Sequence, residues 1–481
     1  MAAWRFKGMD TLLTKIETHQ PSAIAFVETS SQKRISFGEL SESLQSTGNF
    51  LKSWAERSLV FLYATNSIDS ILLYLSCLKL KYPVCLVEPN RQNLQRLIDR
   101  YHPKLLLLPD HVLPPNPCSY SPIPGTGYYI YRADHGLQET VTLHPDLALL
   151  LQTSGSTGSP KLVRLTEQNL SANAFSISTY LKLDAQERSI QSLPMQYSYG
   201  LSLINSHLWV GGTSVLTPHS FIRPEFWQEF NTHQCTSFAG VPYMYETLAR
   251  LKFDPAQHPT LSTLTQAGGG LRPDLIQRFH QQATGAGCRF FVMYGQTEAT
   301  ARIAYVPPEQ LEDKIGSIGI PIPLGHLELA PVEPGSPLQE LVYRGRNVMM
   351  GYAETPACLA LGDRLKGTLR TGDLAQVDAD GFFHLVGRLK RIAKLFGQRI
   401  NLQDVEQELE KAFPLRVAAV DGGKKLNLFA EWLEPGFSDT AILLSHTARF
   451  LQVPPSAINI ELLETLPATA SGKKDYQALQ N

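Results

Sequence analysis

Cysteine is scarce in this sequence, and its spacing excludes the sites that depend on it. Six cysteines are spread over 481 residues, and no two of them form a Cys-x-x-Cys pair. Disulfide frameworks and zinc sites need cysteines at short, regular spacings, so buried and reduced thiols are expected instead. The six positions are Cys77, Cys85, Cys118, Cys235, Cys288 and Cys358.

The sequence also lacks an excess of charge and a long apolar run. Its 43 basic residues nearly balance 44 acidic ones, which leaves a net charge of −1. That balance gives no general attraction to nucleic acid or to an anionic membrane. No apolar run approaches the ~18 residues that suggest a membrane span, and residues 1–7 lack the apolar core of a signal peptide. We therefore expect no nucleic-acid partner, no membrane span and, by default, a cytoplasmic location.

The pattern of apolar residues predicts an α/β fold for most of the chain. Hydrophobic residues are 43% and charged residues 18% of the sequence, which is a globular balance. Short apolar runs alternate with amphipathic stretches, for example over residues 59–63, 67–80 and 83–88. This alternation is typical of α/β units with buried strands. A proline-rich stretch over residues 114–124 predicts a surface connection.

The pattern of predicted helices and strands changes near residue 340, which indicates a second domain. Residues 373–386 predict a hairpin that turns at Asp380-Gly381, and the basic stretch 387–391 follows as a plausible boundary. Beyond it we expect a helix over 404–413 and strands over 418–420 and 427–432. The prediction is a large α/β domain of several subdomains over residues 1–387, followed by a small α+β domain over 388–481.

Residues 153–161, Thr-Ser-Gly-Ser-Thr-Gly-Ser-Pro-Lys, form a loop suited to phosphate after an apolar strand. Glycines let backbone N–H groups approach phosphate oxygens, hydroxyls add donors and a lysine adds charge. The loop is not a Walker A motif, because only two residues separate Gly155 from Gly158. Taken alone, the string is equally compatible with a flexible Ser/Gly turn.

A second candidate site follows the apolar run at residues 289–293, where the chain reads Tyr-Gly-Gln-Thr-Glu. The hydroxyl of Thr297 and the carboxylate of Glu298 at the end of a strand could touch a nucleotide phosphate and hold Mg²⁺. A Thr-Glu pair alone is more often a helix start with a capping role.

Four motifs in order resemble the signatures of the adenylate-forming superfamily, which contains acyl-CoA synthetases, peptide-synthetase adenylation domains and luciferases. They are residues 153–161, Tyr294 to Glu298, Thr371-Gly372-Asp373 and Ser471-Gly472-Lys473. The chain departs from the usual Pro-Lys-Gly ending of the first motif, because Leu162 follows Lys161. The motifs span most of the chain, and their combination is more specific than any one of them.

The resemblance implies a role for each matched residue in an ATP site. The first loop would hold the β- and γ-phosphates, the Tyr294 segment the adenine and α-phosphate, and Glu298 the Mg²⁺. The implied nucleotide-binding residues are Thr153, Ser154, Gly155, Ser156, Thr157, Gly158, Lys161, Gly268, Gly269, Gly270, Tyr294, Gly295, Gln296, Asp373 and Arg388, of which the last two would bind the ribose. Thr297, Glu298 and Lys473 are the implied catalytic residues, and Lys474 is the competitor of Lys473.

The resemblance also implies the reaction. A carboxylate would attack the α-phosphorus of ATP and expel pyrophosphate, with Lys473 bridging the two anions. The small domain would then be mobile and rotate about Lys390, so that a phosphopantetheine thiol could attack the acyl-adenylate. The thiol would belong to CoA or to an acyl carrier protein. A short connection between Val420 and Leu428 suits a carrier protein as the acceptor.

Residues 194–200 resemble a Pro-x-x-His-x-x-Gly segment of acyl-CoA synthetases, with Tyr197 in place of the histidine. Amino-acid-activating members usually have an Asp shortly after it, whereas residues 198–208 contain no acidic residue. A buried ammonium without a carboxylate partner is costly, so an acyl or aryl acid without an α-amino group is favoured. The predicted acyl-pocket residues, each of which could instead be ordinary core, are Tyr197, Tyr199, Phe238, Ala239 and Gly240, with Gly268 beside them.

Two other functions stay open at this point. A stand-alone amino-acid adenylation enzyme that loads a carrier protein would share every nucleotide motif. A non-catalytic nucleotide-binding protein of the same fold would keep ATP binding without exchange. The presence of Lys161, Asp373 and Lys473 together with the Thr297-Glu298 pair argues against loss of activity.

Overall fold

The computed structural model describes residues 10–114, 117–133, 141–152, 161–336, 338–395, 398–423, 425–433, 439–468, 474–476 and 478–479. These residues form two compact units. The first unit contains the described residues up to 326 together with 344–369, and the second contains 327–343 and the described residues from 370 onward.

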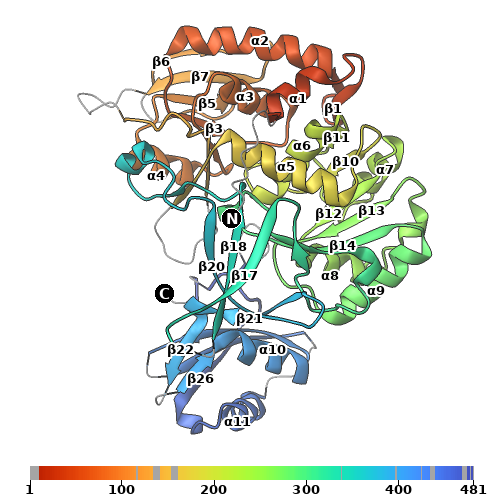
Figure 1. Cartoon of the computed structure of the whole chain (residues 1–481), viewed down its shortest axis with the longest axis vertical. Coiled ribbons are helices and arrows are strands. Elements are labelled where there is room, and N and C mark those ends of the chain that lie inside the picture. The colour runs from red at the N-terminus through yellow and green to blue at the C-terminus, as the bar shows by residue number, and fades with distance from the viewer. Residues whose placement is uncertain are drawn as a thin grey trace. The chain divides into compact units, whose positions relative to one another are not determined.

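Two large sheets organise the first unit (Figure 1). The nine-stranded sheet has the order β16-β15-β14-β13-β12-β10-β11-β1-β2, and its central strands β14 to β1 are parallel. These strands are mostly buried, although several of them, such as β10 and β13, contain polar residues. Their bounds are Ile24–Glu28 (β1), Lys33–Ser36 (β2), Arg188–Gln191 (β10), Thr213–Leu216 (β11), Ser237–Gly240 (β12), Thr263–Gln266 (β13), Arg289–Tyr294 (β14), Ala304–Val306 (β15) and Ile320–Pro321 (β16).

The eight-stranded sheet has the order β19-β9-β8-β4-β3-β5-β7-β6. Its centre, from β8 to β5, is parallel, and antiparallel strands flank it on both sides. Its bounds are Val60–Tyr63 (β3), Val84–Val87 (β4), Leu105–Pro109 (β5), Pro117–Pro122 (β6), Tyr128–Ala133 (β7), Leu149–Gln152 (β8), Leu162–Leu165 (β9) and Gly351–Ala353 (β19).

Helices between the two sheets form the main core. Buried residues of α3, α5 and α6 belong to one cluster with strands of both sheets, and these helices are buried nearly all round. Ser67 begins α3, because its Oγ accepts from the N–H of Ser70 at 3.2 Å. The helices that pack here are Leu12–Thr18 (α1), Phe37–Trp54 (α2), Ile68–Lys79 (α3), Glu167–Leu181 (α5) and Ser198–Val210 (α6).

Other helices cover the outer faces of the sheets. Leu94, Leu97 and Tyr101 of α4 pack on the eight-stranded sheet. On the nine-stranded sheet the contact is aromatic, with Phe279 and Phe290 rings 6.2 Å apart. These helices are Arg91–Tyr101 (α4), Pro224–Thr232 (α7), Pro242–Arg250 (α8) and Pro273–Gly285 (α9). The layered arrangement confirms the predicted α/β class.

The second unit contains mostly antiparallel strands, with one parallel pair between β25 and β26. Its four-stranded sheet has the order β17-β18-β20-β21, and a three-stranded sheet has the order β24-β25-β26. Helix α10 packs its buried Val405 and Leu409 against the latter. The bounds are Gly325–Pro331 (β17), Gln339–Gly345 (β18), Thr368–Val377 (β20), Phe383–Arg388 (β21), Ile392–Leu395 (β22), Gln398–Asn401 (β23), Leu402–Ala412 (α10), Leu415–Asp421 (β24), Leu426–Trp432 (β25), Thr440–Leu451 (α11) and Ile458–Leu462 (β26).

The local predictions that the structure tests are largely confirmed. Strands β3 and β4 with α3 between them match residues 59–88, and β20 and β21 form the predicted hairpin. Gly381 lies in its turn at φ 84°, a left-handed conformation that glycine adopts without strain. The prediction for residues 114–124 was wrong in part, because they contain strand β6 at the edge of its sheet. Prolines are tolerated there because an edge strand need not donate every N–H.

Cysteine behaves as expected in the described parts of the chain. Cys77, Cys85, Cys235 and Cys288 are buried and free, and burial raises the pKa of the Cys77 thiol to about 12. Within the described ranges no cluster of three or more His, Cys, Asp or Glu side chains could hold a metal ion. None of the described helices has the length and apolarity to cross a membrane.

Candidate active site

The predicted Tyr294 segment lies at the end of β14, where the chain makes a tight turn. A Cβ atom on Gly295 would lie 1.8 Å from the carbonyl oxygen of Ala301, so only glycine fits this turn. A short 3₁₀ helix, Thr297–Ala299 (η2), follows. The N–H of Ile303 then donates to the carbonyl of Tyr294 at 2.9 Å as the chain returns along β15. The turn therefore places Thr297 and Glu298 at the carboxyl end of a central strand, where α/β sheets bind ligands.

Asn347 fixes this turn from a distant part of the sequence. Its buried side-chain amide donates to the carbonyls of Ala299 and Arg302, both at 2.8 Å. Thr300 returns a hydrogen bond from its hydroxyl to the carbonyl of Asn347 at 2.6 Å. The sequence reasoning missed Asn347, because no local pattern marks a side chain that closes a turn more than 40 residues earlier.

The carboxylate of Glu298 has one oxygen bound and one open within the described structure. The hydroxyl of Tyr352, on β19, donates to its Oε1 at 2.5 Å. Burial, and then the negative charge of Glu298, raise the pKa of Tyr352, so this hydroxyl stays protonated and acts as the donor. Among the described residues Oε2 of Glu298 has no hydrogen-bond partner. Tyr352 was also missed by the sequence reasoning.

The side chain of Lys161 lies beside Tyr352 and Glu354. Its Nζ lies 2.6 Å from Oε1 of Glu354 and 5.7 Å from the centre of the Tyr352 ring. The pairing of β9 with β19 explains the contact, because Leu162 lies opposite Ala353. The hydrogen bond and charge of Lys161 hold the pKa of Glu354 below its usual range.

These residues fit a Mg²⁺ ion that is held mainly by phosphates. Mg²⁺ usually keeps several waters and binds one or two carboxylates together with substrate phosphate oxygens. Glu298 offers one open oxygen, and in the described chain no acidic cluster surrounds it to form a protein cage. A metal here would take one protein ligand, Glu298, and would neutralise phosphate charge beside Thr297.

The start of α6 contacts both Thr297 and the 268–270 turn. The hydroxyl oxygens of Ser198 and Thr297 are 3.2 Å apart. A Cβ atom on Gly268 would lie 2.6 Å from the hydroxyl of Tyr197, and this glycine has φ 91°. The carbonyl of Gly269 accepts from Nε2 of Gln266 at 2.9 Å. The structure therefore places Tyr197 beside Gly268 and Ser198 beside Thr297.

The predicted acyl-pocket residues fall into two groups. Tyr199 is buried beside Tyr197, with ring centres 6.3 Å apart, and its hydroxyl donates to the carbonyl of Thr265 at 3.0 Å. Phe238 instead packs in the aromatic core, 5.3 Å from Trp227 between ring centres. Neighbouring strand residues Ala239 and Gly240 are buried with it. Of the predicted acyl-pocket residues, Tyr197, Tyr199 and Gly268 thus lie together, whereas Phe238 belongs to the aromatic core.

A buried arginine contacts this cluster and was not predicted. The guanidinium carbon of Arg302 lies 4.0 Å from the centre of the Tyr199 ring, and the residue is 2% exposed. The only signal in the sequence is a basic residue inside the apolar stretch that follows Glu298.

In the second unit, the two predicted ribose residues form an ion pair. Nε of Arg388 lies 2.7 Å from Oδ1 of Asp373, and the two residues face each other across β20 and β21. The turn before Asp373 is held by Glu340 on β18, whose Oε1 accepts from the N–H of Gly372 at 3.0 Å. The carboxylate of Asp373 is 3% exposed and the Arg388 side chain 58% exposed.

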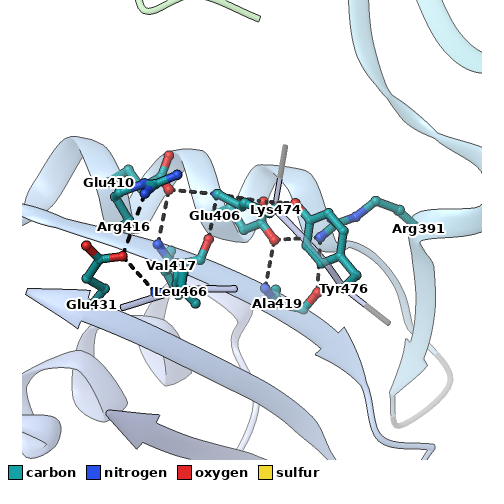
Figure 2. A network of polar contacts seen from close by, with 10 residues as sticks. All are labelled: Arg391, Glu406, Glu410, Arg416, Val417, Ala419, Glu431, Leu466, Lys474 and Tyr476. Carbon is teal, nitrogen blue, oxygen red and sulfur yellow. Dashed lines mark hydrogen bonds and ion pairs between the residues drawn. The ribbon is translucent and has the colours of Figure 1, made fainter. Parts of the chain in front are cut away.

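Lys474 is buried in a network of the second unit, as Figure 2 shows. Its Nζ lies 2.7 Å from Oε1 of Glu410 and 3.2 Å from Oε2 of Glu406, and it donates to the carbonyl of Val417 at 2.6 Å. Burial lowers the pKa of this lysine, but the two carboxylates outweigh burial and the pKa is raised overall. Lys474 is therefore held within the second unit by two carboxylates and a backbone carbonyl.

The same network holds the chain on the far side of Lys474. The hydroxyl of Tyr476 donates to Oε2 of Glu406 at 3.0 Å. The guanidinium carbon of Arg391 lies 3.9 Å from the centre of the Tyr476 ring, and its Nη2 lies 2.6 Å from Oε1 of Glu406 (Figure 2). One buried carboxylate, Glu406, thus binds three side chains, those of Arg391, Lys474 and Tyr476. It also accepts from the backbone N–H of Ala419 at 2.7 Å.

Several predicted residues lie outside the described part of the chain. Lys390 belongs to a 3₁₀ turn, Leu389–Arg391 (η5), in which only its backbone is described. The predicted residues outside the description are Thr153, Ser154, Gly155, Ser156, Thr157, Gly158 and Lys473.

Solved structures of two enzymes share this fold. The o-succinylbenzoate CoA synthetase of Bacillus subtilis, solved with its acyl-adenylate intermediate, has a TM-score of 0.76 and 20% identity, covering 98% of this chain and 97% of that one. ATP-bound MatB of Rhodopseudomonas palustris has a TM-score of 0.78 and 20% identity, covering 98% of both chains. At this identity the likeness shows the fold.

Sequence comparison shows the family. Residues 13–353 match the sequence profile of the AMP-binding enzymes. A feruloyl-CoA synthase of Amycolatopsis is 31% identical over 343 residues, which are 68% of this chain and 68% of that one. A sulfoacetate–CoA ligase of Cupriavidus necator is 30% identical over 344 residues, 69% of this chain and 67% of that one. The chain belongs to the AMP-binding enzyme family, as the motifs predicted.

Proposed function

We propose that this enzyme is an ATP-dependent acid–thiol ligase. It activates a carboxylic acid to an acyl-adenylate with release of pyrophosphate and then transfers the acyl group to a phosphopantetheine thiol. The observation that carries this proposal is the turn after β14, which holds Thr297 and the half-open carboxylate of Glu298 at the end of a central strand. The family match and the names of the similar CoA ligases support it.

In this proposal each group acts on one part of the reaction. Residues 153–158 and Lys161 hold the β- and γ-phosphates, Glu298 binds Mg²⁺, and Asp373 with Arg388 binds the ribose. Lys473 bridges the attacking carboxylate and the α-phosphate in the transition state. The domains over 1–387 and 388–481 rotate about Lys390 between the two half-reactions.

The acid substrate has no α-amino group. The residues beside Thr297 that would surround such a group include the cation of Arg302 on the Tyr199 ring. A buried cation repels an ammonium, so an amino acid is disfavoured both by this charge and by the missing acidic residue in α6.

CoA is the proposed acceptor, because the similar proteins are named CoA ligases. A carrier protein presents the same thiol, and the connection between β24 and β25 is short, at residues 422–425. The acceptor can be decided by thioester formation with CoA and with a phosphopantetheinylated carrier protein in parallel.

The decisive experiment is acid-dependent exchange of pyrophosphate into ATP, measured on the full chain with fatty, aryl and amino acids. Exchange with one of the first two groups, followed by thioester formation with CoA, is the expected result. Exchange only with an amino acid would replace the proposal by amino-acid adenylation. ATP binding without exchange for any acid would indicate a non-catalytic protein.

A further inference from the structure

Arg302 is a buried cation without a counter-ion in the described structure. The residue is 2% exposed, and it forms no ion pair with any residue that the structure describes. Its Nη1 lies 3.5 Å from the carbonyl oxygen of Ala301, at the far limit of a hydrogen bond. Its Nε is buried without a hydrogen-bond partner in the described chain, as are those of Arg164 and Arg391, and its side chain also has a hydrogen bond with Tyr180. The missing counter-ion is therefore what distinguishes Arg302. Removing a charge from water without compensation is costly.

Other buried arginines of the chain show what a purely structural role looks like. Arg164 donates through Nη2 to the carbonyls of Met350 and Gly362, at 3.0 and 3.3 Å, and also bonds Leu361. Arg391 pairs with Glu406. Arg302 has neither a set of well-placed carbonyls nor a carboxylate, so the contacts described for it leave its charge available to a ligand.

The aromatic neighbours of Arg302 do not neutralise it. Burial raises the pKa of Tyr199, and it raises the pKa of Tyr180 to about 12 although Arg302 opposes the change. Burial likewise raises the pKa of Tyr197, again against Arg302. All three phenols are therefore neutral near pH 7. The Tyr199 ring offers a cation–π contact, which accommodates a guanidinium but carries no net negative charge.

Arg302 also lies where a substrate can meet it. It follows Glu298 by four residues, and Asn347 binds the carbonyls of both Ala299 and Arg302. Its guanidinium stacks on Tyr199, which neighbours Tyr197, and the Tyr197 hydroxyl lies beside Gly268. The guanidinium thus contacts Tyr199, and the backbone of Arg302 belongs to the turn that carries Thr297 and Glu298.

We propose that Arg302 binds a second anionic group of the acid substrate, so that the enzyme activates acids that carry a carboxylate or sulfonate besides the reacting carboxylate. This inference rests on the proposed function and narrows its substrate class. A guanidinium suits both anions because it is always charged and presents donors in a planar fork. The chemistry of recognition is the same for the two, and the experiment separates them.

The test uses pyrophosphate exchange by the full chain with matched acids. Each pair consists of a monocarboxylic acid and the acid of the same length with a terminal carboxylate, and a third member carries a terminal sulfonate. We expect the wild type to favour the dianionic members by about a hundredfold or more in kcat/KM, because a site built for a polar group rejects an analogue that lacks it. The acid with the higher kcat/KM, the one with a terminal carboxylate or the one with a terminal sulfonate, identifies the second anion.

Three variants complete the experiment. Arg302→Met keeps the stem but removes the charge, and it should abolish the preference while retaining exchange with monocarboxylic acids. Arg302→Lys should restore part of the preference. Arg289→Met is the matched control, because Arg289 also stacks on a ring, Phe291 at 5.6 Å, but bonds Leu181 and Thr263. Its preference should equal that of the wild type.

Two results would overturn the inference while leaving the proposed function intact. One is a wild type that uses mono- and dianionic acids equally well or prefers the former. The other is an equal loss with both kinds of acid in Arg302→Met, which would make Arg302 a structural residue or a contact of the reacting carboxylate. Absence of exchange with every acid would overturn the proposed function as well. If Arg302→Met does not fold, the wild-type panel and Arg302→Lys still decide the question.

Discussion

A single carboxylate, Glu298, stands at the end of β14 with one oxygen bound by the Tyr352 hydroxyl and the other open within the described structure. Because no acidic cluster of the described chain surrounds it, the affinity for Mg²⁺ must come from this carboxylate and from the nucleotide phosphates. The hydrogen bond from Tyr352 limits the orientations of the carboxylate. If Glu298 is the metal ligand, as proposed, Tyr352 on a strand of the other sheet would orient its carboxylate before ATP binds.

Glu298→Gln tests this role. The amide keeps the size of the side chain and can still accept from Tyr352, but it removes the charge. We expect kcat/KM for exchange to fall about a hundredfold, equivalent to about 3 kcal/mol of transition-state stabilisation, and the Mg²⁺ concentration for half-maximal rate to rise. Titration of Mg²⁺ at saturating ATP measures both.

Glu354→Gln is the matched control for Glu298→Gln. Glu354 belongs to the same group of side chains but is exposed and pairs with Lys161. Its loss should change exchange by no more than a few-fold, since exposed ion pairs contribute little. A similar loss in both variants would show that general charge, and not a metal ligand, determines the rate.

The adjacent residues Lys473 and Lys474 are predicted to have different roles, the first in adenylation and the second in stability. Lys473→Ala should abolish acid-dependent exchange and leave thiolysis of a supplied acyl-adenylate largely intact, because the lysine acts only in adenylation. Lys474→Met should instead lower the free energy of unfolding by about 3 kcal/mol, since it leaves Glu406 and Glu410 without their buried partner. Exchange and thiolysis assays with urea unfolding separate the two effects.

The opposite result in these assays would exchange the roles assigned to Lys473 and Lys474. Full exchange activity in Lys473→Ala, together with loss of exchange in a stable Lys474→Met, would mean that Lys474 leaves its network to reach the nucleotide. Equal loss of both half-reactions in Lys473→Ala would refute its role in adenylation alone.

Among the elements, the turn between β14 and η2 is the most tightly determined by sterics. It reverses the chain within a few residues, and the Gly295 backbone passes so close to Ala301 that any side chain would collide with it. The nearby 268–270 turn also approaches its neighbours closely at Gly268, beside Tyr197. Both turns lie at strand ends, so backbone freedom at single positions decides where the side chains of the site stand.

Gly295→Ala should therefore distort the turn and displace Thr297 and Glu298. We expect both loss of exchange and a clear drop in melting temperature, because the new Cβ would meet backbone and not a flexible side chain. Gly285→Ala, at the end of α9, is the control, since an added Cβ there meets nothing within 4 Å. It should be neutral or slightly stabilising, and equal losses in both variants would contradict this account.

At the scale of the whole molecule, the core of the first unit contains a buried histidine, His207, whose protonation makes the stability of the protein depend on pH. His207 of α6 is 3% exposed, and its Nδ1 bonds the carbonyl of Leu203 at 2.8 Å. Burial lowers its pKa, although the Leu203 carbonyl and Glu187 oppose the shift. The folded protein therefore holds this histidine neutral at pH values where the unfolded chain would protonate it.

The sign of the pH dependence follows from this lowered pKa. Above the unfolded value of about 6.5 the ring is neutral in both states and stability is unaffected. As the pH falls below it, only the unfolded chain takes up the proton, and stability falls by up to about 1.4 kcal/mol per pH unit until the folded pKa is reached. His207→Gln should lose less stability than the wild type between neutral pH and pH ~5, as measured by urea unfolding. If the free energies of unfolding of the wild type and of His207→Gln fall equally with pH, His207 is excluded as a source of the acid sensitivity.

The sequence by itself determined the alternation of strands and helices, the hairpin at Gly381 and the order of the nucleotide motifs. Apolar periodicity, glycine in tight turns and hydroxyl caps are local properties, and residues close in sequence suffice to show them. The apolar parallel strands of the eight-stranded sheet, such as β3 and β4, are determined in the same way. Strands β10 and β13 of the nine-stranded sheet contain polar residues and give no such signal.

Only the tertiary structure decided which side chains meet. Tyr352 reaches Glu298 because β19 pairs with β9, and Arg302 meets Tyr199 because β15 returns along β14 beside α6. The sequence places Lys473 and Lys474 side by side with equal chemistry, and the packing of Glu406 and Glu410 on α10 selects Lys474 for burial. Partners so far apart in the chain leave no local pattern, since burial and charge pairing depend on the neighbours that folding supplies.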